Sequence, residues 1–315
     1  MEKLSIIVPV YYNQDNLLPL YADMKTKVLD KLDCDYELIF VDDGSGDRSY
    51  EVMEQLALID PHVLTLKLSR NFGEHAAILA GLSRCTGTCA IRKAADLQDP
   101  SELVLEMLAQ YHAGYKVVLA VREGRDEPWH QRAASSIYTL MMRKLALPNM
   151  PKGGFDCFLI DKQVIRILTH MNEKNTSLMA QILWSGFKTC TVPYQRQKRR
   201  IGKSRWTLSK KVKLFIDSLL GFSYFPIRFI TGIGICSFLG SLIWMVVALA
   251  AKITARVTVE GYTTLLMLLL MSFGVIMLSL GILGEYLWRM FDATRNRPPF
   301  ILDEPGDSGL KKEAK

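Results

Sequence analysis

The segment Lys93–Pro100 holds two carboxylates and one carboxamide within four residues, at Asp96, Gln98 and Asp99. Hard oxygen ligands gathered at the end of a strand are what a divalent cation on a diphosphate requires. Ala94 stands where a second aspartate would complete an Asp-x-Asp pair. The alternative is a surface loop whose aspartate and proline only start the next helix.

Strand and helix patterns alternate around this segment. The expected strands are Ser5–Val10, Tyr36–Val41, Val63–Leu68, Cys89–Lys93 and Lys116–Val121. The expected helices are Leu17–Leu32, Ser49–Ile59, Glu74–Ser83 and Glu102–Ala113. This alternation predicts an α/β fold with a mostly parallel sheet that is covered by helices on both faces.

Polar residues follow every one of these expected strands. They are Tyr11, Asp42–Ser45, Arg70–Gly73, Asp96–Asp99 and Arg122. Ligands of such folds bind beyond the carboxyl ends of the strands, so this convergence indicates a site more strongly than any single motif. The chain has neither GxGxxG nor GxxxxGK[ST], and dinucleotide and P-loop sites therefore lack support.

The net charge of +7 favours an anionic partner, which could be nucleic acid, a phosphorylated substrate or a membrane surface. We recognise no nucleic-acid-binding module and expect no nucleic-acid partner. In the basic segment Arg196–Trp206, Gly202 and Ser204 favour a flexible loop that closes over phosphate, although a basic run beside a membrane can also bind lipid headgroups. The six cysteines form no CxxC pair, which disfavours zinc and disulfides and fits a reducing cytosolic setting.

Two apolar stretches, 227–251 and 262–287, lie near the C-terminus. Each is long enough to cross about 30 Å of hydrocarbon as a helix, and a pair of buried core helices is the alternative. Lysines and arginines flank the pair and are sparse between its members, so both ends should face the cytoplasm. We expect a cytoplasmic domain over 1–205, a juxtamembrane amphipathic helix over 206–226, two transmembrane helices and a cytoplasmic tail over 288–315.

Together these motifs resemble the family-2, A-type (GT-A) glycosyltransferases. Within them, the chain is similar to the polyprenyl-phosphate glycosyltransferases, such as bactoprenol glucosyltransferases and dolichyl-phosphate mannose synthases. The resemblance covers nearly the whole chain. The ordered motifs are Ile7–Tyr11, Val41–Asp47, Arg70–Gly73, Ala95–Pro100, Gly186–Phe187, Val192–Tyr194, Arg200–Ser204, Phe222–Arg228 and Gly281–Tyr286.

The resemblance implies an enzyme with a Rossmann-like GT-A domain. It would move one sugar, with glucose the first choice, from a UDP-sugar to undecaprenyl or another polyprenyl phosphate, with inversion. It implies Mg²⁺ or Mn²⁺, a multi-pass location in the inner (plasma) membrane, and a homo-oligomer that is a tetramer in some relatives. A GDP-mannose or aminoarabinose-type transferase, a catalytically silent membrane scaffold and a processive polysaccharide synthase are the alternatives.

The resemblance also implies roles for individual residues. The donor would contact Pro9, Tyr11, Asp43, Arg70, Lys93, Arg200, Lys203 and Ser204. The metal would be held by Asp96 and Gln98. The acceptor phosphate would contact Arg122, Arg132, Ser135 and Ser136. The catalytic candidates are Arg122 with Asp99 and Asp156; each aspartate would be a base or an orienting group, or equally a helix cap.

Three positions depart from the family pattern. Ala94 leaves Asp96 as the only carboxylate of the usual pair, which puts metal affinity in question. Tyr12-Asn13 stands where many members have Asn-Glu, and Phe158 replaces a frequent arginine. Beside the metal position, Lys93 could partly substitute for metal charge on the diphosphate or could point away.

Overall fold

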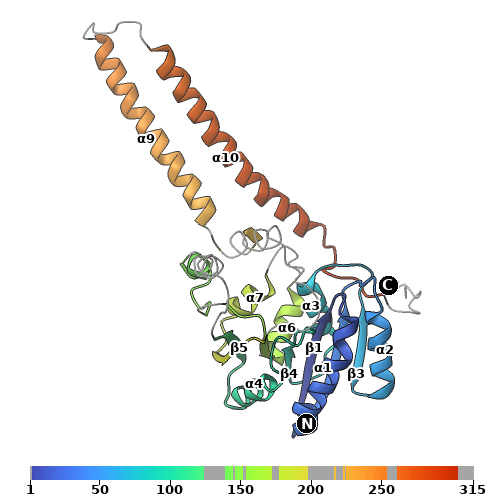
Figure 1. Ribbon diagram of the computed structural model, residues 1–315. Coiled ribbons are helices and arrows are strands. Elements are labelled where there is room, and N and C mark those ends of the chain that lie inside the picture. The colour runs from blue at the N-terminus through green and yellow to red at the C-terminus, as the bar shows by residue number, and fades with distance from the viewer. Residues whose placement is uncertain are drawn as a thin grey trace, which may run out of the picture.

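The structure is a computed structural model that describes residues 2–123, 139–144, 146–151, 154–171, 177–197, 216–217, 223, 225–253 and 261–303. A sheet forms the centre of one part, and two long helices leave that part on one side (Figure 1). Seven strands are present in the described residues: β1 (Lys3–Val10), β2 (Asp35–Asp42), β3 (Val63–Lys67), β4 (Cys89–Arg92), β5 (Val117–Arg122), β6 (Phe158–Asp161) and β7 (Thr189–Tyr194).

The strand order is β3-β2-β1-β4-β6-β5-β7. Only β6 runs antiparallel to its neighbours β4 and β5 among these strands, so the prediction of a mostly parallel sheet is confirmed. The chain builds outward from β1 through β2 to β3 and then crosses to β4 on the other side of β1. In open α/β sheets, ligands bind beyond the carboxyl ends of the strands at which the strand order reverses, which here are β1 and β4.

Helices cover both faces of the sheet. They are α1 (Gln14–Lys27), α2 (Ser49–Ile59), α3 (Glu74–Arg84), α4 (Leu103–His112), α6 (Lys162–His170) and α7 (Leu178–Trp184). Side chains of α1, α2 and α4 share one buried cluster, and side chains of α3, α6 and α7 share the other. The expected helices α2, α3 and α4 are confirmed to within one residue at each end, whereas α1 begins three residues before the expected Leu17.

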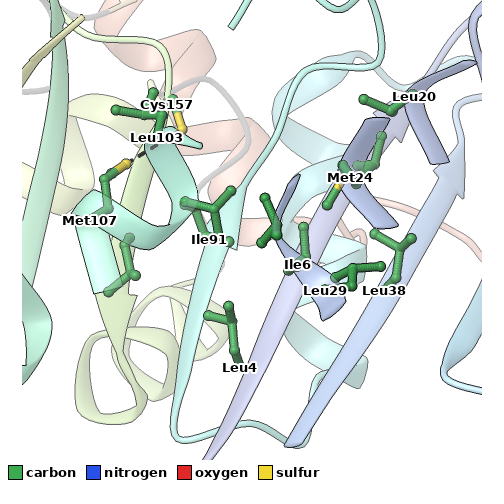
Figure 2. Close-up of a cluster of buried hydrophobic side chains, with 14 of the residues drawn as sticks. Leu4, Ile6, Leu20, Met24, Leu29, Leu38, Ile91, Leu103, Met107 and Cys157 are labelled. Atoms are coloured by element: carbon green, nitrogen blue, oxygen red, sulfur yellow. Dashed lines mark hydrogen bonds between the residues drawn. The ribbon is translucent and has the colours of Figure 1, made fainter. Parts of the chain in front are cut away.

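The alternation of side chains along β1 separates these two clusters. Leu4 and Ile6 point into the cluster with α1 and α4, while Ile7 belongs to the cluster on the other face. Figure 2 shows Ile6 near Met24 of α1, with Leu4 and with Met107 of α4 in the same cluster. Because successive strand residues face opposite sides, an apolar run such as this one specifies a strand that is buried on both faces.

The long helices are α9 (Phe225–Ile253) and α10 (Tyr262–Thr294), which lie side by side (Figure 1). At 1.5 Å per residue they are about 43 and 50 Å long. Within the described residues, one stretch, Met271–Thr294, is long and apolar enough to cross a membrane, and a shorter apolar stretch is Ile227–Cys236. Length and composition thus support one of the two expected spans, that of α10, and the expected span in α9 stays a prediction.

After α10 the chain returns to the sheet, where residues 301–303 run antiparallel beside the end of β3. The amide of Ser69 donates to the carbonyl of Ile301 at 2.9 Å, and the amide of Asp303 donates to the carbonyl of Lys67 at 2.7 Å. The ammonium of Lys67 lies 3.7 Å from the carboxylate of Asp303. The carboxyl end of β3 therefore lies on the side of the sheet to which α10 leads.

We predict that Leu302→Ala loosens this attachment. Leu302 packs, half-buried, against the buried cluster that contains α3, so its truncation removes apolar contact. The Ser69 amide should exchange its hydrogen about tenfold faster, since a loss of about 1.4 kcal/mol in local opening is tenfold. Hydrogen exchange read by mass spectrometry checks this, with the Ile39 amide inside β2 as the unchanged control. Equal exchange at Ser69 in both proteins would contradict the prediction.

Candidate functional site

The loops after β1 and β2 meet at the carboxyl edge of the sheet. The amide of Tyr12 donates to Ser45 Oγ at 3.0 Å, and Tyr12 adopts a left-handed conformation with φ of 54°. Its ring lies edge-on to that of Tyr11 with 4.7 Å between centroids. Pro9 lies opposite Val41 in the β1–β2 register. The expected base-contact residues Pro9 and Tyr11 therefore lie at one corner of the carboxyl edge.

Asp43 ties this corner to the loop after β3. Its buried carboxylate accepts from the amide of Phe72 at 2.7 Å and from the amide of Gly73 at 3.0 Å. Burial raises the pKa of Asp43 to about 6, although the two amides act in the opposite direction. In the same loop, the exposed guanidinium of Arg70 lies 4.0 Å from the centre of the Phe72 ring.

Gly44 allows the two loops to approach closely. Its φ of 67° is a conformation that side-chain-bearing residues rarely adopt, and a Cβ built there would lie 2.5 Å from the carbonyl carbon of Arg70. The close approach holds the loop of Arg70 against the end of β2. A glycine at this position is therefore required by both backbone conformation and space.

The loop after β4 presents Asp96 and Gln98 together. The amide of Gln98 donates to Asp96 Oδ1 at 3.2 Å, and Leu97 between them has φ of 58°. Gln98 also binds the segment after β7: its carbonyl accepts from the Gln197 amide at 2.8 Å, and its side-chain oxygen accepts from the guanidinium of Arg196. The predicted metal loop is thus joined to the start of the basic segment.

Two buried cations lie behind this loop. The ammonium of Lys93, which is 1% exposed, donates to the carbonyl of Asp99, and burial lowers the pKa of Lys93. The guanidinium of Arg92 pairs with Glu74 and lies 3.7 Å from the carboxylate of Asp99. The sequence left open whether Lys93 faces the diphosphate or points away from it. In the structure its side chain points away from solvent and toward the loop backbone.

A hydrogen-bonded chain continues from Asp99 to the ends of β5 and β7. The hydroxyl of Tyr194 donates to Asp99 Oδ1 at 3.0 Å and accepts from Nε of Arg122 at 3.4 Å. Arg122 forms an ion pair with Asp156, which precedes β6. The site network comprises Glu74, Arg92, Asp99, Tyr194, Arg122 and Asp156.

Of the sixteen candidate residues, six lie at the β4–β5 side of the edge. Five of them, Asp99, Arg122, Asp156, Asp96 and Gln98, lie in the network or in the metal loop, and Lys93 supports that loop. Pro9, Tyr11, Asp43 and Arg70 lie at the β1–β3 corner. The candidates outside the described residues are Arg132, Ser135, Ser136, Arg200, Lys203 and Ser204.

Asp43 of the β1–β3 corner lies beside the start of the site network. The Gly73 amide that binds its carboxylate directly precedes Glu74, the first member of the site network. The corner beside β1 and the network beside β4 are therefore parts of one continuous polar edge.

Three members of the network, Tyr194, Arg92 and Glu74, are not among the predicted site residues, although Tyr194 ends the motif Val192–Tyr194. Tyr194 ends β7, a parallel strand that was not expected, and the rule that ligand residues follow strand ends would have found it. Arg92 lies inside β4, and Glu74 begins α3. A buried arginine needs a carboxylate partner, but no spacing in the sequence identifies which one.

The fold is that of a Rossmann-like α/β protein, and the candidate site lies at the carboxyl ends of its strands. Residues 5–169 match the model of the glycosyl transferase family 2, and the chain belongs to this family. The expected GT-A type of glycosyltransferase agrees with the mostly parallel sheet. The chain is therefore a glycosyltransferase.

Curated relatives match almost the whole chain. An uncharacterized glycosyltransferase of Bacillus subtilis, YkcC, is 34% identical over 95% of this chain and 93% of its own length. A prophage bactoprenol glucosyl transferase homolog of Escherichia coli is 31% identical over 95% and 98%. An undecaprenyl-phosphate 4-deoxy-4-formamido-L-arabinose transferase of Proteus mirabilis is 30% identical over 100% and 97%.

We predict that Gly44→Ala displaces the Arg70 loop. Position 44 has a left-handed backbone, which alanine adopts with strain, and the added methyl group would overlap the carbonyl carbon of Arg70. Because the Arg70 loop must move to relieve this overlap, trypsin should cleave after Arg70 several times faster. Gly114→Ala is the matched control, because Gly114 also has positive φ, at 92°, but nothing lies within 4 Å of its added Cβ. Both variants should lose about 1–2 kcal/mol from the left-handed conformation, read by thermal unfolding. Equal cleavage after Arg70 in the two variants would contradict the steric argument.

Proposed function

We propose that this glycosyltransferase moves one sugar from a UDP-sugar to undecaprenyl or another polyprenyl phosphate, with inversion at the anomeric carbon. Glucose is the first candidate for the sugar. The reaction takes place at the cytoplasmic face of the membrane. The observation that carries the proposal is the continuous connection from the Asp96–Gln98 loop, through Asp99 and Tyr194, to Arg122.

This connection supports a donor side and an acceptor side that lie next to each other. A loop with Asp96 and Gln98 suits the diphosphate of a sugar nucleotide, and Arg122 suits a phosphate monoester. The two expected groups of ligands thus lie on adjoining parts of the same edge. Full-length similarity to proteins named as bactoprenol and undecaprenyl-phosphate transferases supports the polyprenyl phosphate as acceptor.

The residues present fit a divalent cation that is shared with the substrate. Asp96 offers one carboxylate and Gln98 one carboxamide oxygen, while in the described part of the chain no group of three or more His, Cys, Asp or Glu side chains could hold a metal. Mg²⁺ is commonly held by one or two carboxylates together with substrate phosphates. When bound by Asp96 and Gln98, Mg²⁺ or Mn²⁺ would neutralise charge on the departing nucleoside diphosphate.

The other side chains of the site bind and orient the two substrates. Asp43 would accept an N–H from the base, and Pro9 and Tyr11 would line the same pocket. Lys93 would support the loop by donating to the Asp99 carbonyl. Asp99 would orient neighbouring side chains and would not act as a base, because its carboxylate is buried and already accepts from Tyr194. Arg200, Lys203 and Ser204, which lie outside the described residues, would close over the diphosphate.

Arg122 would receive the lipid phosphate together with Arg132 and the hydroxyl of Ser135 or Ser136. In the structure Arg122 pairs with Asp156, whose side chain is 47% exposed. An incoming phosphate would compete with that carboxylate for the guanidinium. A phosphate monoester is already anionic near neutral pH, so the nucleophile needs orientation more than it needs a strong base.

The long helices support a membrane anchor. Large apolar side chains of α10 are exposed along the apolar stretch, with Met271 at 69% and Phe273 at 59%, and such surface is stable in lipid. We propose that α9 and α10 span the bilayer as a hairpin. The attachment of residues 301–303 to β3 supports a hairpin, since it brings the chain after α10 back to the catalytic domain.

The transfer assay tests the proposal. Purified protein with UDP-glucose and undecaprenyl phosphate should yield a lipid that carries one sugar, resolved by mass spectrometry, and a long glycan or no lipid product would contradict it. A panel of nucleotide-sugars, with and without Mn²⁺, tests the sugar and the metal. The panel includes a 4-deoxy-4-formamido-L-arabinose donor, because the Proteus relative that is named for this sugar matches the entire chain.

Asp96→Ala should abolish transfer. It removes the only carboxylate among the proposed metal ligands, and we expect a fall of about 100-fold or more in turnover with little change in thermal unfolding. Asp33→Ala is the control, because Asp33 is an exposed aspartate before β2, at the opposite end of the strands. Turnover at the wild-type rate by Asp96→Ala would refute the metal assignment.

Donor binding should depend on pH through Asp43. Since burial raises the pKa of Asp43 to about 6, with nearby Asp42 and Glu74 contributing, the carboxylate becomes protonated as the pH falls through this value. At pH 5.5 about a quarter of it would be ionised, so the affinity for UDP-glucose should be about fourfold lower than at pH 7.5. Calorimetry measures this, and Asp43→Asn should bind weakly without this dependence. An affinity that is equal at both pH values would argue against a base contact by Asp43.

A further inference from the structure

The hydroxyl of Tyr194 lies between the two halves of the site, and no contact with either substrate is proposed for it above. The β5–β7 register ends on the pair Arg122 and Tyr194, so both side chains leave the sheet at its carboxyl edge. The amide of Glu123 donates to the carbonyl of Tyr194 at 2.7 Å, which extends the pairing by one residue. The backbone therefore fixes the position of the tyrosine relative to Arg122.

The chemistry of the two partners fixes the direction of each hydrogen bond. The carboxylate of Asp99 can only accept, and the guanidinium of Arg122 can only donate. The hydroxyl has one proton, which it donates to Asp99 at 3.0 Å, while its oxygen accepts from Arg122 Nε at 3.4 Å. A phenylalanine would fill the same space and make neither bond.

The hydroxyl remains protonated at physiological pH. Burial, with a contribution from the Asp99 carboxylate, raises the pKa of Tyr194 to about 12. A general acid or base has a pKa near the working pH, so Tyr194 is not suited to proton transfer. Its contribution must come from geometry.

The Asp99 end of this bridge is held firmly. Its carbonyl accepts from the ammonium of Lys93, and its carboxylate lies 3.7 Å from the guanidinium of Arg92. Asp99 is 4% exposed and Tyr194 is 6% exposed. The Arg122 end is more open, because its side chain is 18% exposed and its other partner, Asp156, faces solvent.

We propose that Tyr194 is a positioning residue that holds Arg122 in the orientation required to receive the acceptor phosphate. Its hydroxyl links the guanidinium of Arg122 to Asp99, whose position is fixed. Asp99 lies three residues after Asp96 of the metal loop. The distance between the donor diphosphate and the acceptor phosphate is thereby set by one buried hydroxyl. This inference rests on the proposed transfer to a polyprenyl phosphate.

Kinetics of Tyr194→Phe test the proposal. The variant keeps the buried ring and removes the hydroxyl, and kcat/KM for undecaprenyl phosphate should fall about tenfold, which is the size expected for one hydrogen bond to a charged group. The KM for UDP-glucose should stay within about twofold of the wild-type value. In the Arg122→Ala background the same change should have little further effect, because it acts through Arg122.

Tyr111→Phe is the matched control. The Tyr111 hydroxyl also donates to a carboxylate, that of Asp161 at 3.2 Å, but it lies at the opposite end of β6 from Asp156. A purely structural hydroxyl would give both variants the same kinetics. Equal kinetics of the two variants, or losses that add fully to that of Arg122→Ala, would overturn the role of Tyr194 while leaving the proposed function intact. Failure of the wild-type protein to glycosylate undecaprenyl phosphate would overturn both.

Discussion

The pairing of buried charges at the carboxyl edge of the sheet is the constraint on which the site depends. The side chains of Arg92 and Asp99 are 9% and 3% exposed, and a charge removed from water costs several kcal/mol unless it is paired. Glu74 and Tyr194 complete the pairing on either side. Each partner comes from a different element, so the loops after several strands can form their native arrangement only together.

This constraint explains why the loop of Asp96 can tolerate an alanine at position 94. In this chain the loop is supported from behind by cations, with the ammonium of Lys93 on the Asp99 carbonyl and the guanidinium of Arg92 near the Asp99 carboxylate. The loop conformation is therefore maintained without a second acidic residue at its start. Relative to the family pattern, Ala94 leaves one negative charge fewer near Asp96. This difference would affect the affinity for a cation but not the formation of the loop.

Much of the fold could be predicted because its local signals are strong. The strands β1 to β5 are rich in apolar residues, and the polar residues after them mark the edge of the candidate site. The strand β6 has four residues and runs antiparallel between parallel neighbours, so neither its length nor the alternation of strands and helices revealed it. The attachment of residues 301–303 to β3 joins segments more than 230 positions apart, and periodicity contains no information on such pairing.

The sequence by itself determined the fold class, the family and the side chains available to the site, because these follow from apolar periodicity and from short ordered motifs. Only the tertiary structure decided which of those side chains meet. It turned Lys93 inward under the loop, bound Asp99 to Tyr194, and paired Arg122 with Asp156. The physical reason is that a buried charge takes its partner from whichever element packs beside it, and strand order, not distance along the chain, decides which element that is.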